Sequence, residues 1–215
     1  GFINVRLTNN TLVELCVKMD APRLGVISDK DKHPVAIDLC GVNVAKQLHV
    51  GHLRSTIIGD ALARVFERLG RTVFRENHLG DWGLPIAMVL ERLLTTGVDL
   101  DALQIDDLNV AYKDAQLEAK DDLRGSKTAC LIGAGPHRTC ELEEQNAGAG
   151  GAQESAKSVL VRLQQGDEKL LHQWQQLIDC TMGEVYVSLE KLNVKLGPDN
   201  NRGESFYRDR LVGVV

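Results

Sequence analysis

The sequence has no hydrophobic run long enough to span a membrane, and it has no excess of positive charge. Its 215 residues carry a formal net charge of −5. This balance argues against a general nucleic-acid binder, because such proteins neutralise phosphates with a basic surface. The opening residues also lack the basic, apolar and small-residue pattern of a signal peptide. We therefore expect a soluble, cytoplasmic protein that makes no membrane contact.

Cysteine pairs at metal-binding spacing are also missing. The chain holds five cysteines, an odd number, without any Cys-x-x-Cys pair: Cys16, Cys40, Cys130, Cys140 and Cys180. Such usage is typical of reduced thiols in a cytosol and not of a disulfide framework. It also disfavours a zinc site, because Cys40 stands nine positions before His49 and has no paired partner.

The segment from Val35 to Asp60 predicts a strand, a loop and a helix. Apolar residues alternate over 35–39, which favours a short strand buried in a parallel sheet. From Leu53 the apolar residues recur at helical spacing until Gly70, a residue typical of the position after a helix. A second strand is expected over 72–77. In such strand–helix–strand units, ligands bind beyond the carboxyl ends of the strands.

The first turn of the predicted helix carries His49, Gly51 and His52. The two histidines stand three positions apart, so they project from roughly one face. Helix N-termini attract anions, and imidazole N–H groups suit the developing charge of a reacting nucleotide phosphate. Gly51 lets a flat base approach the backbone. Taken alone, however, a His-x-x-His pattern is more often structural than catalytic.

The residues around these histidines extend the pattern. The run Asn43-Val-Ala-Lys46-Gln-Leu-His49-Val-Gly-His52-Leu-Arg-Ser-Thr-Ile-Ile-Gly-Asp60 resembles the ATP-binding signature of class I aminoacyl-tRNA synthetases, specifically of the arginyl-tRNA synthetases. Further blocks fit the same family in order: Gly1–Asn4, Asn77–Gly83 and Arg202–Tyr207. The resemblance implies an α/β fold, a Rossmann-like parallel sheet that forms the first half of a class I catalytic domain, with a helical insertion.

The resemblance implies an arginine–tRNA ligase. In that reaction the arginine carboxylate attacks the α-phosphate of ATP, and arginine then passes from the adenylate to the terminal ribose of tRNA(Arg). By this resemblance His49, Gly51 and His52 bind ATP, and His49, His52 and Lys46 act in catalysis. Magnesium arrives with the ATP and needs no dedicated protein site.

The resemblance also assigns residues to the amino acid. Asp38 matches a family position whose acidic side chain faces the bound arginine, and a carboxylate suits a planar, permanently charged guanidinium. Asn43 matches the amide that holds the amino-acid end. His78, Asp81 and Trp82 follow the adjacent strand, so we expect them at the mouth of the same cleft. Without the family, Asp38 or Asn43 is more simply explained as the cap of a turn.

The chain departs from the family pattern in two respects. Val42 stands where family members usually have a proline before the asparagine. A proline would fix the backbone φ angle at this point of the loop, and valine does not. The family's second signature loop, which bears a lysine, and its anticodon-binding domain have no counterpart in the 215 residues. We therefore expect tRNA(Arg) to bind mainly through domains absent here, the parent enzyme to be monomeric, and the isolated chain to be inactive.

Composition and periodicity divide the rest of the chain. Residues 1–34 are interpreted as the linker and tail of an N-terminal appended domain, with a strand over Phe2 to Leu7. Residues 35–96 form the first half of the catalytic domain, 97–193 a helical insertion, and 194–215 a return to the sheet that begins with a strand near Val194.

Helical periodicity is strongest in and just before the insertion. Helices are predicted over 84–96, 107–124, 153–164 and 168–192, with Trp174 in the core. Between 125 and 151 the glycine and alanine content rises and periodicity disappears, which predicts a mobile loop.

The sequence also fits two other functions. A small-molecule nucleotidyltransferase shares a His-x-Gly-His turn on a similar fold, although it would lack the blocks Asn77–Gly83 and Gly203–Tyr207. A non-catalytic module derived from a synthetase would keep the shape without turnover. Titration with ATP and arginine separates such a module from an enzyme.

Overall fold

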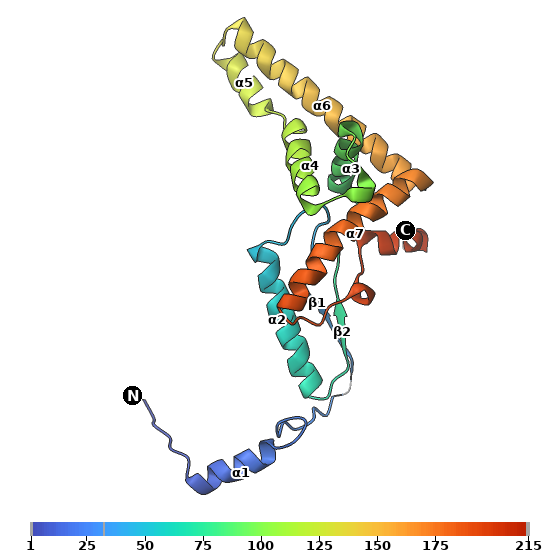
Figure 1. The fold of residues 1–215 in the computed structure, drawn as a ribbon. Helices are drawn as coiled ribbons and strands as arrows, with labels where there is room; N and C mark the ends of the chain where they lie inside the picture. The colour runs from blue at the N-terminus through green and yellow to red at the C-terminus, as the bar shows by residue number, and fades with distance from the viewer. Residues whose placement is uncertain (1, 32, 214–215) are drawn as a thin grey trace.

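The computed structural model describes residues 2–31 and 33–213, and it shows a mostly helical chain around a two-stranded parallel sheet (Figure 1). The elements, in chain order, are α1 (Asn9–Met19), β1 (Val35–Asp38), α2 (Val50–Arg68), β2 (Val73–Glu76), α3 (Leu84–Thr96), η1 (Leu100–Ala102), α4 (Ile105–Glu118), α5 (Leu123–Leu131), α6 (Pro136–Gln164), α7 (Glu168–Lys191), η2 (Pro198–Asn200) and η3 (Glu204–Gly213). Residues 1, 32, 214 and 215, which belong to the first and last predicted domains, lie outside the described residues.

The predicted strand–helix–strand unit is confirmed. β1 and β2 pair in parallel, in a register that runs from Val35 opposite Val73 to Asp38 opposite Glu76, and α2 connects them. Both carboxyl ends therefore meet at one edge of the sheet. Beyond that edge an isolated bridge between Asn43 and Gly80 continues the pairing. The loops that leave this edge carry the residues of the candidate site.

Gly70 ends α2 as predicted. Its φ is 80°, a left-handed conformation that glycine adopts without a Cβ penalty. The N–H of Gly70 donates to the carbonyl of Glu67 at 2.9 Å, and the N–H of Arg71 donates to the carbonyl of Phe66 at 3.0 Å. This is the Schellman pattern, which satisfies carbonyls that the last helical turn leaves without a partner.

The hydrophobic core lies mainly among α3, α4, α6 and α7, and it reaches the loop after β1. Leu90, Leu108, Leu163 and Leu177 are each at most 1 % exposed. Residues 39, 40, 42, 44 and 45 of the loop belong to the same cluster. The loop that leads to α2 is thus packed into the helical core. Among the described residues, no helix combines the length and apolar character needed to cross a bilayer.

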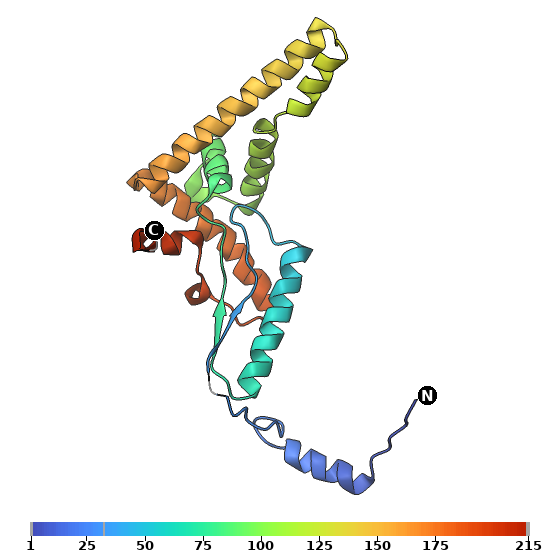
Figure 2. The same cartoon turned by 180° about the vertical axis from the view of Figure 1, so that it is seen from behind.

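Two predicted strands are wrong. Residues 2–8 have no regular structure; Phe2 and Ile3 are 103 % and 90 % exposed, so their apolar side chains have no sheet to join. α1 follows them and, in both views, stands apart from the rest of the chain (Figures 1 and 2). Residues 194–196 also form no strand. The chain instead meets the sheet edge later, through a parallel bridge between Asn201 and Asn77.

The mobile loop predicted over 125–151 is also wrong, because α5 and α6 cover most of it. Pro136 begins α6, a position where its missing N–H removes no helical hydrogen bond. The glycine- and alanine-rich stretch lies inside α6, where Ala149 is 1 % exposed and the glycines at 148, 150 and 151 face open space. Asn146 of α6 accepts from the N–H of Asp122 and donates to Ser126, which fastens α5 to it. The contacts of Asn146 and the burial of Ala149 therefore outweigh the low helix propensity of the exposed glycines beside them.

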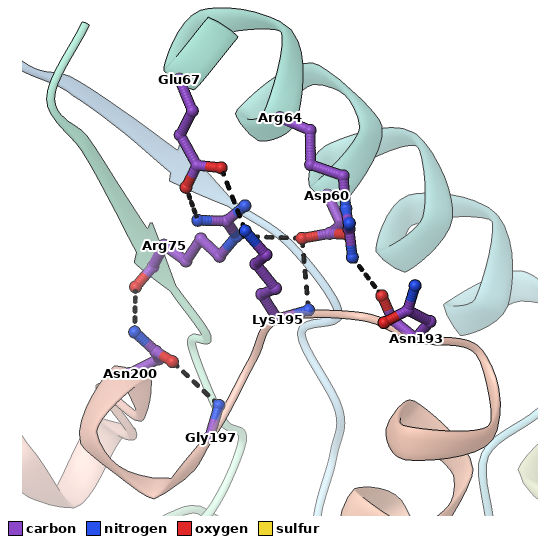
Figure 3. A network of polar contacts seen from close by, with 8 residues as sticks. All are labelled: Asp60, Arg64, Glu67, Arg75, Asn193, Lys195, Gly197 and Asn200. Carbon is purple, nitrogen blue, oxygen red and sulfur yellow. Dashed lines mark hydrogen bonds and ion pairs between the residues drawn. The ribbon is translucent and has the colours of Figure 1, made fainter. Parts of the chain in front are cut away.

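A buried carboxylate fastens α2 to β2 and to the segment after α7 (Figure 3). Asp60 Oδ1 accepts hydrogen bonds from Arg75 Nε at 2.9 Å and from the N–H of Lys195 at 3.3 Å. Asp60 Oδ2 accepts from Arg64 Nε at 2.6 Å, and Glu67 accepts from Arg75 Nη1. Asp60 and Arg75 are both buried. Because α2 carries the two histidines at its start, this network helps to set where they stand.

The charges in this network shift one another's protonation. Burial by itself raises the pKa of Asp60, but the hydrogen bonds from Arg64 and Arg75 outweigh it and hold this pKa below its usual range. The hydrogen bond from Arg75 lowers the pKa of Glu67, and Glu67 in turn raises the pKa of Arg75. The network is therefore ionised at neutral pH.

We predict that Asp60→Asn lowers the free energy of unfolding by about 3 kcal/mol, because it removes one of the two carboxylates that pair with the buried Arg75 and leaves only Glu67. Urea unfolding followed by circular dichroism measures the change. Glu154→Gln, which removes one side of an exposed ion pair with Lys157, is the control and should cost less than about 0.5 kcal/mol. Equal losses in the two variants would show that the Asp60 network does not hold α2.

We also predict an acid-dependent loss of stability from the same carboxylates. The pKa values of Asp60 and Glu67 are lower in the folded than in the unfolded state. Their contribution to the free energy of unfolding is therefore fully present above the unfolded pKa of about 4, and it is lost as the pH falls through the pKa values of the folded state. Urea unfolding between pH 7 and pH 3 should show that the free energy of unfolding falls less with decreasing pH for Asp60→Asn than for the unmodified chain. Parallel declines would contradict this prediction.

Candidate active site

The loop between β1 and α2 has an unusual backbone for a buried segment. Cys40, Gly41 and Ala45 have φ angles of 73°, 64° and 72°. For the two residues with a side chain, such left-handed conformations cost about 1–3 kcal/mol each. Cys40 is nevertheless 4 % exposed and Ala45 is fully buried. The surrounding structure must therefore impose this shape on the loop.

Side chains from distant parts of the sequence hold the loop in place. The N–H of Gly41 donates to Asn77 Oδ1 at 3.0 Å, and the N–H of Ala45 donates to Thr181 Oγ1 at 3.1 Å. Two further backbone hydrogen bonds join the loop to Gly80, each 3.1 Å long. These contacts compensate for the strained conformations and deliver the chain to the start of α2 in a defined direction.

The structure brings His49 and His52 together at the N-terminus of α2. His49 is the N-cap residue, and its Nδ1 accepts from the N–H of Gly51 at 3.1 Å. His52 Nδ1 accepts from the N–H of His49 at 3.3 Å. The two rings stack, with centroids 3.8 Å apart and an interplanar angle of 28°. His49 is exposed and His52 half-buried, so the pair lies at the surface.

These hydrogen bonds define the tautomer of both rings. An Nδ1 that accepts a hydrogen bond carries no proton, so each neutral ring holds its proton on Nε2. Within the described part of the chain, neither Nε2 atom has a hydrogen-bond partner. Burial lowers the pKa of His52, and the charges of His49 and Lys46 lower it further. His52 is therefore a neutral N–H donor at physiological pH.

Gly51 has a local role that the sequence did not reveal. A Cβ at this position would lie 2.8 Å from His49 Cε1 and 3.0 Å from its Nδ1. The His49 ring folds back over the backbone at Gly51 in order to accept its N–H. A side chain would push the ring away, so the glycine is required by the histidine cap itself.

Asp38 and His78 meet at the carboxyl edge of the sheet. Asp38 Oδ1 lies 3.1 Å from His78 Nδ1, and the hydroxyl of Tyr207 lies 3.4 Å from His78 Nε2. The side chains of Asp38 and His78 are 61 % and 47 % exposed. The carboxylate matched to arginine recognition is thus accessible, with His78 as its neighbour.

Asn43 and Lys46 line two small hollows next to the loop. Asn43 lines a hollow of about 150 Å³ together with Tyr112 and Glu204. Lys46 lines another of about 140 Å³ beside Thr181 of α7. The ammonium group of Lys46 lies 5.5 Å from the centre of the Tyr112 ring, a cation–π arrangement. Lys46 is also near enough to lower the pKa of His52.

The structure does not place Asp81 at the mouth of a cleft, so that prediction is wrong. Asp81 is 3 % exposed, and its carboxylate accepts from the N–H and the hydroxyl of Ser205 at 3.0 and 2.6 Å. Its carbonyl accepts from Trp174 Nε1 at 2.7 Å. Trp82 packs edge-on against Trp174, with ring centroids 5.2 Å apart. Only His78 of the three contacts another predicted site residue.

Asn77 is a site-forming residue whose role sequence reasoning missed. It is fully buried, and besides accepting from Gly41 it donates through Nδ2 to Asn201 Oδ1 at 3.0 Å. Asn201 in turn donates to the hydroxyl of Tyr186 on α7 at 2.6 Å. The amides of Asn77 and Asn201 thus join the loop, the end of β2 and α7. In the sequence, Asn77 stands out only as an asparagine directly after a predicted strand. Its hydrogen-bond partners, Gly41 and Asn201, lie far away along the chain and could not be identified from the sequence.

Comparisons with known proteins agree with this architecture. The family described as "tRNA synthetases class I (R), catalytic domain" matches residues 18–215. An arginine–tRNA ligase of Shigella sonnei is 36 % identical over 218 residues, which cover 100 % of this chain and 33 % of that protein. One of Erwinia tasmaniensis is 38 % identical over 217 residues, with 100 % and 33 % covered.

Solved structures show the same fold. The crystal structure of arginyl-tRNA synthetase from Plasmodium falciparum superposes with a TM-score of 0.59 at 25 % identity, covering 97 % of this chain and 32 % of that one. The Thermus thermophilus arginyl-tRNA synthetase, at 24 % identity, gives a TM-score of 0.58 and covers 93 % and 27 %.

The chain spans about a third of the length of the curated relatives that it matches. The family match nevertheless covers nearly all of the chain, including both loops that leave the carboxyl edge of the sheet. The chain therefore belongs to the arginine-type class I aminoacyl-tRNA synthetases, within the catalytic domain of that family.

Proposed function

We propose that the protein is an arginine–tRNA ligase, which activates L-arginine with ATP and transfers it to tRNA(Arg). The observation that carries the proposal is the stacked pair His49 and His52 at the N-terminus of α2, each with its proton on Nε2. The relatives named as arginine–tRNA ligases support the same substrate class. Membership of this family leaves no observation in favour of a small-molecule nucleotidyltransferase.

The two imidazoles act on the phosphates of ATP. When the arginine carboxylate attacks the α-phosphorus and pyrophosphate leaves, negative charge develops on the phosphoryl oxygens. Two N–H donors that are already oriented, at a helix end that favours anions, stabilise this charge without reorganising. His52 does this as a neutral donor, because its pKa is lowered. Lys46 adds a positive charge beside the loop, and Mg²⁺ arrives with the ATP.

Arginine is recognised at the carboxyl edge of the sheet. Asp38 presents an exposed carboxylate there, which is the group that pairs best with a planar guanidinium. His78 lies against Asp38 and orients it until the guanidinium binds. Asn43, in the same loop as Lys46, holds the amino-acid end. Because Gly51 has no side chain, the His49 ring can lie against the backbone there, and the nucleotide base can approach the same backbone.

The wider organisation follows from the same assignment. Residues 35–96 and 194–215 form part of the nucleotide-binding catalytic domain, and residues 97–193 are a helical insertion. Residues 1–34 are the linker and tail of an appended domain. The tRNA binds mainly through parts of the protein outside this chain, and the enzyme works as a monomer in the cytoplasm.

We predict that His52→Ala in the full-length protein slows ATP–pyrophosphate exchange by an amount equivalent to about 2–4 kcal/mol of transition-state stabilisation, as for the loss of an oriented oxyanion donor. His137→Ala serves as the control, because that side chain is 90 % exposed on α6. An unchanged turnover number in His52→Ala would rule out the phosphate role.

We further predict that Asp38→Asn raises the KM for arginine about 10- to 100-fold, the loss expected for one charge-assisted hydrogen bond. The KM for ATP should stay within about twofold, because Asp38 pairs with His78 and is not among the hydrogen-bond or stacking partners of His49 and His52 in the described residues. Asp106→Asn, at an exposed position of α4, provides the matched charge change. Equal effects on both substrates would point to damage of the loop and not to arginine recognition.

A further inference from the structure

A single buried hydroxyl links α7 to the middle of the loop between β1 and α2. Thr181 Oγ1 accepts from the N–H of Ala45 at 3.1 Å and donates to the carbonyl of Leu177, one turn earlier in α7, at 2.9 Å. Both Thr181 and Ala45 are fully buried. The helix therefore uses the proton of the hydroxyl, and the lone pair that remains faces the loop.

Ala45 is the point at which the loop turns from the sheet edge toward α2. The residue before it, Val44, still donates to the carbonyl of Gly80. Ala45 itself is left-handed, with a φ of 72°, so its N–H points away from that pairing and toward α7. Lys46 follows directly, and His49 caps α2 three residues later. The hydrogen bond to Thr181 compensates for a conformation that alanine otherwise avoids.

We propose that Thr181 is a positioning residue for the ATP site, acting through Ala45 to set where Lys46 and His49 stand. This inference rests on the proposed function of that loop. α7 reaches the same loop a second time through Tyr186, Asn201 and Asn77, which together hold Gly41. The helical insertion thus contributes to the architecture of the active site and is not merely an appendage on the sheet.

The experiment compares Thr181→Val, Thr181→Ser and Leu170→Ala in the full-length protein. Valine keeps the shape but removes the acceptor, whereas serine keeps the hydroxyl. Leu170 is a buried residue near the start of α7, so its truncation lowers stability without touching the loop. Hydrogen–deuterium exchange of residues 43–49 reports the loop itself, and calorimetric titration with ATP reports the site.

Thr181→Val should speed amide exchange over residues 43–49 and weaken ATP binding, each about tenfold, as expected for the loss of one hydrogen bond to a buried donor. Thr181→Ser and Leu170→Ala should both stay within about twofold of the unmodified protein. If Thr181→Val does not fold, Thr181→Ala takes its place with the same expectation.

The proposal is overturned if the loop amides of the Thr181→Val protein exchange as in the unmodified protein, or if Leu170→Ala produces the same changes. A serine variant that behaves like the valine variant would also overturn it. Should the unmodified protein bind no ATP, the proposed function fails, and the exchange arm alone then decides whether Thr181 positions the loop.

Discussion

The candidate site depends on which nitrogen of His49 and His52 carries the proton. Both rings accept a backbone N–H through Nδ1, so both present Nε2–H outward. The same contacts cap the helix, because they satisfy N–H groups that have no partner in the first turn. Helix capping and the proposed contact with phosphate thus require the same tautomer. The stacked arrangement also disfavours two charged rings, in keeping with the lowered pKa of His52.

Two sets of contacts hold this pair of rings in place, one in the loop before α2 and one along the helix itself. At the start, the strained loop is fixed by Asn77 and Thr181, which lie outside α2 and the loop. Further along the helix, the ion network of Asp60 and Arg75 fastens it to β2 (Figure 3). The first set fixes the loop that leads into the helix, and the second joins the helix to the neighbouring strand.

Local patterns predicted the elements well. The apolar periodicity of α2, its glycine cap and the extent of α3 are properties of adjacent residues. The failures share a physical cause, which is dependence on distant partners. Asp81 is buried because Ser205 satisfies its carboxylate 124 positions later, and Thr181 bonds to Ala45 across 136 positions. α6 stays helical through its glycine-rich part because α3 and α5 pack against other positions of the same helix, which no local propensity shows.

The family match over residues 18–215 shows membership of the arginine-type synthetases. We propose that His49 and His52 offer two Nε2–H donors to the phosphates of ATP. Nitrogen-15 NMR of the imidazole rings, recorded with and without ATP, tests it most directly. We expect Nδ1 of both rings to lack a proton, as their hydrogen bonds require, and both Nε2 resonances to shift when ATP binds. Rings protonated at Nδ1, or Nε2 resonances that ATP leaves unchanged, would contradict the account.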